Sequence, residues 1–110
     1  MSFRDYQMAK TKYKQIFEGI WNNNKELFQE FFILNNDYAD SKKRANIEDA
    51  FQTIGLKVQQ LLRTGENELC RQMEKSNHRV FSSNVADKYW DEVRNYFKYI
   101  DMVGVKTVRR

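Results

Sequence analysis

The side chains best suited to chemistry lie in the stretch LCRQMEKSNHRVF, which runs from Leu69 to Phe81. It contains the only cysteine of the chain, Cys70, and the only histidine, His78. A thiol needs a neighbouring base to act as a nucleophile, and a catalytic histidine usually needs a second group to hold it. Because the chain offers a single histidine, we interpret Cys70 as a small buried apolar residue.

Arg71 and His78 are separated by six residues. This spacing resembles the loose Arg-x4–6-His pattern of HEPN ribonucleases, which are small helical-bundle proteins that act as dimers. The resemblance covers two residues. It implies that Arg71 steadies the cleaved phosphate and that His78 acts on the ribose hydroxyl or the leaving oxygen. On a continuous helix, seven residues span about two turns, or ~10 Å. We therefore predict no catalytic residue and keep a metal-independent ribonuclease as the second alternative.

The sequence predicts no metal site and no cofactor. One cysteine and one histidine cannot form a zinc site within a single chain, and no P-loop, GxGxxG or GxSxG motif occurs. The net charge of +4 comes from 19 basic and 15 acidic residues that are interleaved along the chain. A basic nucleic-acid-binding accessory protein is the first alternative function. Its candidate phosphate contacts are Lys42, Lys43, Arg44, Arg109 and Arg110.

The apolar pattern predicts an all-α fold. No proline interrupts the chain, and apolar residues recur at steps of three and four through two long stretches. We expect an antiparallel hairpin of two long helical arms, over about residues 2–35 and 41–76. Each arm has one point where it could bend or break, at Asn22–Asn24 and at Thr64–Gly65, although the apolar spacing continues through both. The competing interpretation is a globular bundle of four or five helices.

A shorter C-terminal helix is predicted to pack on this hairpin. We expect it to follow a loop, HRVFSSN, to be capped by Ser83 or Asn84, and to end at Gly104. Its stripe of aromatic residues favours core packing over base stacking. The aromatics predicted to form the core or an interface are Phe28, Phe31, Phe51, Tyr89, Trp90 and Phe97.

The lengths of these helices predict a partner. A helix of about 17 residues cannot cover two arms of about 35 residues each. Half of each apolar stripe would then be exposed, and large exposed apolar patches mark interfaces. We therefore predict a non-enzymatic helical interaction or adaptor module that acts through protein–protein contacts, as a homodimer or with another protein.

The length predicts one helical domain over residues 1–105 and a frayed basic tail over residues 106–110. No apolar run approaches the ~18 residues of a membrane span. The stretch MSFRDYQMAK lacks the apolar segment of a signal peptide, and one cysteine cannot form an internal disulfide. These features predict a cytoplasmic protein without a membrane partner.

Overall fold

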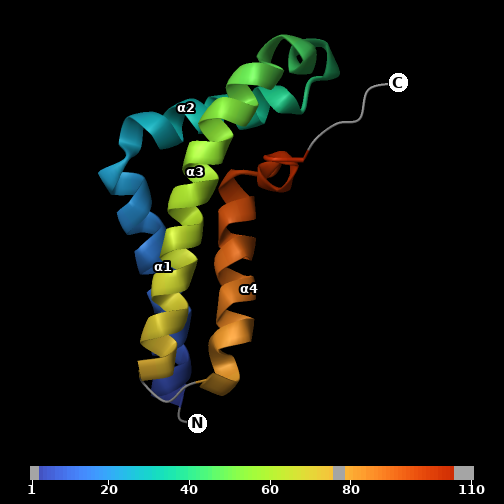
Figure 1. Ribbon diagram of the computed structural model, residues 1–110. Helices are drawn as coiled ribbons and strands as arrows, with labels where there is room; N and C mark the ends of the chain where they lie inside the picture. Colours follow the sequence, from blue (N-terminus) through green and yellow to red (C-terminus); the bar gives the residue numbers. More distant parts are fainter. Residues whose placement is uncertain (1–2, 76–78, 106–110) are drawn as a thin grey trace.

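A computed structural model describes the backbone of residues 3–75 and 79–105 and the side chains of residues 12–73 and 85–105. Over these residues the predicted all-α fold class is confirmed (Figure 1). The elements are α1 (Phe3–Asn23), α2 (Lys25–Tyr38), α3 (Ser41–Lys75), α4 (Arg79–Tyr96) and a short 3-10 helix, η1 (Ile100–Met102).

The second predicted arm is one continuous helix. α3 runs for 35 residues and passes through Thr64 and Gly65 without a break. A helix of this length spans about 50 Å, and the longest dimension of the molecule is 50 Å. Asp40 precedes α3, and its carboxylate accepts the backbone N–H of Lys42 at 2.9 Å. Such a cap satisfies a backbone donor that the first turn of a helix leaves unpaired.

The first predicted arm is divided at Asn24. This residue has φ −137° and ψ 45°, outside the α-helical region. Its side-chain Nδ2 donates to the carbonyl oxygen of Ile20 at 2.9 Å, and its own carbonyl accepts the N–H of Phe28 at 3.0 Å. Asn24 therefore closes α1 and opens α2. Three consecutive asparagines have low helix propensity, so the chain can change direction here at little cost.

The break allows the first arm to cover α3 in two parts. α1 and α4, which both run antiparallel to α3, lie alongside one half of it, and α2 crosses the other half (Figure 1). Phe17 of α1, Phe31 of α2 and Leu62 of α3 all belong to one cluster of buried apolar side chains. The core is therefore continuous along the length of α3.

α4 differs from its prediction at both ends. The predicted loop is wrong for residues 79–84, because their backbone is already helical. Ser83 and Asn84 are thus interior residues of α4 and not its caps. At the other end, the α-helix stops at Tyr96 and does not continue to Gly104. The chain leaves the helix there because the following apolar residues are used against α2 and α3.

The segment Phe97–Val105, which we call the C-terminal segment, lies over α2 and α3. Asn35 Oδ1 accepts the N–H of Tyr99 at 3.0 Å, and Gln52 Oε1 accepts the N–H of Gly104 at 2.8 Å. Gly104 has φ 81°, a left-handed conformation that glycine adopts without a steric penalty. The apolar side chains that the segment buries are Phe97, Ile100 and Val103.

The uncovered apolar stripe that motivated the predicted homodimer is absent from the described part of α3. Phe51, Val58, Leu62 and Leu69 each have 0% of their surface exposed. The reason is that α2 and the C-terminal segment cover the half of α3 that α4 does not reach. The homodimer itself stays a prediction, but burial of α3 no longer requires it.

Two glycines of α3 lie where other elements approach its backbone closely. A Cβ atom added at Gly55 would lie 2.7 Å from Cγ2 of Val103 in the C-terminal segment. One added at Gly65 would lie 2.5 Å from the hydroxyl oxygen of Tyr89 in α4. Glycine in a helix interior costs about 1 kcal/mol relative to alanine. Here the absence of a side chain allows the C-terminal segment to pack closely on α3 at Gly55 and α4 to pack closely on it at Gly65.

We expect Gly65→Ala to lower the free energy of unfolding by about 1–3 kcal/mol, because the added methyl group overpacks the core. Gly19→Ala is the matched control, since Gly19 is also helical and a Cβ there has no atom within 4 Å. It should raise the free energy of unfolding by about 0.5–1 kcal/mol. Urea denaturation measures both. A gain of stability in Gly65→Ala would contradict the close approach of α4 to α3.

The hydroxyl of Tyr89 links α4 to α3. The side chain is fully buried, and its hydroxyl donates to the carbonyl oxygen of Leu62 at 2.6 Å. Burial raises the pKa of Tyr89 well above its ordinary value, and the nearby Glu66 carboxylate adds to the rise. The folded state therefore favours the neutral phenol.

Tyr89→Phe should lower the free energy of unfolding by about 1 kcal/mol at neutral pH, because it removes a buried hydrogen bond. The unfolded tyrosine ionises near pH 10 whereas the folded one stays neutral, so the wild type loses stability as the pH rises above about 10. The variant lacks this loss. Denaturation at neutral and alkaline pH should show the advantage of the wild type shrinking as the pH rises. An advantage that does not change with pH would contradict a buried hydroxyl.

Candidate functional site

An exposed group of aromatic side chains lies near the ends of α1 and α4. Trp21 is half-buried, while Phe32 has 37% and Tyr96 45% of its surface exposed. The ring centroids of Trp21 and Tyr96 are 5.7 Å apart, and those of Trp21 and Phe32 are 6.2 Å apart. We call Trp21, Phe32 and Tyr96 the aromatic surface. Exposed aromatic side chains are enriched in protein interfaces.

Buried aromatic neighbours hold this surface in place. The indole ring of Trp21 stacks on Phe97, with centroids 5.2 Å apart and an angle of 8° between the ring planes. Phe17, one turn earlier on α1, contacts Trp21 edge-on at 5.9 Å. Phe32 directly follows a fully buried residue, and Tyr96 directly precedes one. Because consecutive helical residues point in different directions, both rings lie at the edge of the core.

A hollow of about 230 Å³ opens beside Trp21. Its lining combines three aromatic rings with two exposed polar side chains, Glu18 and Asn22. No ion pair from a described side chain reaches the Glu18 carboxylate. The site therefore offers an aromatic wall with one free negative charge at its rim.

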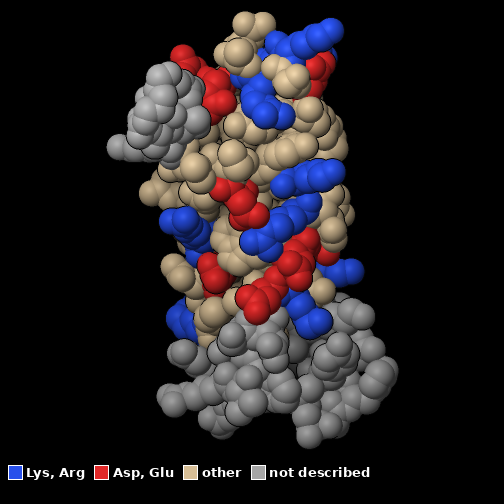
Figure 2. Space-filling model, turned by 90° about the vertical axis from the view of Figure 1, so that its right-hand side faces the viewer, with Lys and Arg blue, Asp and Glu red and all other residues tan. Residues whose placement is uncertain are grey.

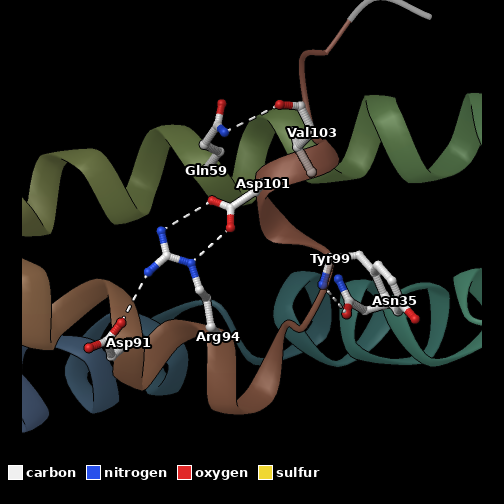
Figure 3. A network of polar contacts seen from close by, with 7 residues as sticks. All are labelled: Asn35, Gln59, Asp91, Arg94, Tyr99, Asp101 and Val103. Atoms are coloured by element: carbon white, nitrogen blue, oxygen red, sulfur yellow. Dashed lines mark hydrogen bonds and ion pairs between the residues drawn. The ribbon is translucent and has the colours of Figure 1, made fainter.

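A second hollow, of about 250 Å³, lies between α3, α4 and the C-terminal segment. Figure 3 shows the Arg94 guanidinium between two carboxylates. Its Nε donates to Asp101 at 2.8 Å and its Nη1 to Asp91 at 3.2 Å, and the bond to Asp101 raises the pKa of Arg94 further. Two basic residues, Arg63 and Arg94, face two acidic ones, Glu66 and Asp101, around this hollow. The lining of this hollow therefore carries no excess of either charge.

The basic cluster consists of Lys42, Lys43 and Arg44. Two of its three side chains make contacts within the protein. The Nε of Arg44 donates to the carbonyl oxygen of Tyr38 at 2.8 Å, and its guanidinium lies 4.8 Å from the centre of the Tyr38 ring. Lys43 pairs with Asp37 at 3.5 Å. Lys42 is exposed. The cluster therefore stabilises the α2–α3 turn, and only Lys42 presents a charge that no contact from a described side chain uses.

The face of the molecule seen in Figure 2 carries no extended region of one charge. Basic and acidic side chains alternate across it. Arg109 and Arg110, the other candidate phosphate contacts, lie outside the described residues, as does the whole tail predicted to fray. A track for a nucleic-acid backbone would require grouped positive charges.

The described part of the stretch LCRQMEKSNHRVF belongs to α3, with Leu69 and Met73 buried in the core. Arg71 is exposed on α3, and its Nε donates to the Glu68 carboxylate at 3.2 Å. Glu68 lies three residues earlier on the same helix, so the pair is of a kind that contributes little to stability. Cys70 is half-buried rather than fully buried. His78 lies outside the described residues.

Most aromatics predicted for the core or an interface lie in the core. Phe28, Phe31, Phe51, Tyr89 and Phe97 each have 0% of their surface exposed. Trp90 is half-buried and lines the second hollow.

The prediction missed Trp21 and Phe32, which lie beside the predicted apolar stripe and not on it. Their spacing fits an apolar helix face, since Trp21 lies four residues after Phe17 and Phe32 four residues after Phe28. Spacing alone does not show that these two rings reach the surface.

The described residues contain no group of three or more side chains that could hold a metal ion. None of the helices within the described ranges is both long and apolar enough to cross a membrane. Comparisons with known protein families, with curated proteins and with solved structures find no match to the chain.

The role of the basic cluster can be tested by stability. Arg44→Ala should lower the free energy of unfolding by about 1 kcal/mol, because it removes a hydrogen bond and a cation–π contact. Lys42→Ala is the control and should change it by less than about 0.5 kcal/mol. If Arg44→Ala left stability unchanged but weakened binding to single-stranded RNA, the cluster would be a phosphate-binding site instead.

Proposed function

We propose that this protein is a non-enzymatic helical interaction module that binds a partner protein through the aromatic surface. The observation that supports the proposal is the partly exposed cluster of Trp21, Phe32 and Tyr96, of which Trp21 and Tyr96 also line a hollow. Tryptophan and tyrosine are enriched among the residues that contribute most to binding, because each buries a large area with few freely rotating bonds.

The packing of the core indicates what kind of partnership this is. The apolar face of α3 is covered within one chain, so the protein does not need a partner in order to bury its core. Obligate interfaces resemble a divided core and bury 2,000 Å² or more in total, as an order of magnitude. The aromatic surface consists of three side chains, two of which line the hollow. A surface of this size suits a smaller contact between a folded module and a segment of a partner.

The sequence also predicts a homodimer, so a second copy of this chain is the first partner to test. Two copies could meet through the aromatic surface in a two-fold contact, in which the same patch faces itself. Sedimentation equilibrium at micromolar concentrations measures such self-association. A dimer that persists in a Phe32→Ser variant would use a different surface and would contradict a role for the aromatic surface in self-association.

We expect Phe32→Ser to weaken partner binding at least about tenfold, as the loss of a central interface aromatic does. Its free energy of unfolding should fall by about 1–2 kcal/mol, less than for a fully buried phenylalanine, because 37% of the Phe32 surface is already exposed. Leu56→Ser is the matched control, since Leu56 has 50% of its surface exposed on α3 and does not belong to the aromatic surface.

The partner can be found by photo-crosslinking in the source cells, with p-benzoylphenylalanine at position 32 in one variant and at position 56 in the control. We expect a discrete adduct from position 32 only. Purified partner should then bind the wild type and Leu56→Ser equally and bind Phe32→Ser weakly. Equal binding by all three proteins would contradict the proposal.

A further inference from the structure

The hollow beside Trp21 has a chemistry that constrains what can occupy it. The inference rests on the proposed function and concerns the side chain that a partner places there. The wall is aromatic, formed by Phe17, Trp21 and Tyr96. The face of an aromatic ring carries partial negative charge, so it attracts a cation as well as an apolar group.

Glu18 adds a full negative charge at the same rim. It is exposed on α1, within the lining of the hollow, and no described basic side chain is paired with it. Two other exposed carboxylates, those of Asp91 and Asp101, are instead paired with Arg94. The Glu18 carboxylate would repel an anion. A neutral apolar side chain would make no favourable electrostatic contact with this carboxylate.

We infer that the hollow binds a cationic side chain of a different protein, an arginine or lysine carried next to apolar residues on an amphipathic segment. The alkyl part of such a side chain lies against the rings and its charge reaches the carboxylate, a division that long basic side chains make readily. The neighbouring Phe32 receives the apolar residues of the same segment.

A second copy of this chain fits the hollow less well. In a two-fold contact centred on the hollow, each Glu18 would face the Glu18 of the other copy. Like charges placed opposite each other disfavour such a contact. The charge at the rim therefore favours a partner whose basic residue is not balanced by an identical carboxylate.

A peptide series tests the inference. The probe is a 15-residue amphipathic helical peptide with leucines on one face and a central arginine beside them. Its matched control replaces that arginine by citrulline, which has the same shape and no charge. Calorimetry measures affinity, and the indole N–H signal of Trp21 in the NMR spectrum, assigned with a Trp90→Phe variant, reports where the peptide binds.

We expect the arginine peptide to bind about three- to tenfold more tightly than the citrulline peptide, as an ion pair and a cation–π contact together allow. In Glu18→Gln this preference should disappear. In Glu26→Gln, which removes an exposed carboxylate of α2 outside the hollow, it should remain. Added salt should reduce the preference in the wild type.

Four results would overturn the inference. Equal affinities for both peptides, with a shifted Trp21 signal, would show an apolar docking surface and leave the proposed function intact. A preference that survives in Glu18→Gln would place the cation elsewhere. Absence of any Trp21 shift, together with normal partner binding by Phe32→Ser, would reject both the cationic site and the aromatic surface. A Trp21 signal that shifts with protein concentration alone would identify a second copy as the occupant.

Discussion

The burial of α3 is the constraint on which the rest of the structure depends. This helix spans 35 residues and carries apolar side chains along its whole length. No single helix of the remaining chain is long enough to cover it, since the next longest, α1, has 21 residues. The chain meets the constraint in parts: α1 and α4 cover one half, and α2 with the C-terminal segment covers the other. The break at Asn24 and the close approaches at Gly55 and Gly65 follow from this arrangement.

The same arrangement decides which apolar surface is left for function. The fully buried apolar residues of α3 are not accessible to a partner, whereas Leu56 has 50% of its surface exposed. The aromatic surface lies instead at the junction where α1 gives way to α2 and α4 gives way to the C-terminal segment. Each ring at this junction is supported by the core on one side, so it is held rigidly while its other side is free. As the proposed binding surface, the aromatic surface would lose little conformational entropy when a partner docks.

The helices could be predicted from the sequence because apolar spacing reports helices directly. The spacing also predicted that α3 is continuous. It indicated Asn22–Asn24 as a point where the first arm could bend or break, but it could not decide for the break, because the apolar pattern continues through Asn24 even though the backbone turns there. Nor could it predict the C-terminal segment, whose anchors Ile100 and Val103 keep a helical spacing after the helix has ended. The aromatic surface was missed for a related reason: Phe32 becomes a neighbour of Trp21 only through the change of direction at Asn24.

The most direct test of the account is hydroxyl-radical footprinting of the purified protein, read residue by residue by mass spectrometry. The account predicts rapid oxidation of Trp21, Phe32 and Tyr96 and protection of Phe28, Phe31 and Phe51. These six residues are all aromatic, so differences in their oxidation report mainly exposure. Oxidation of Phe31 or Phe51 would show that α2 and the C-terminal segment leave α3 uncovered. Protection of Phe32 in dilute protein would show that the aromatic surface belongs to the core, and it would contradict the account.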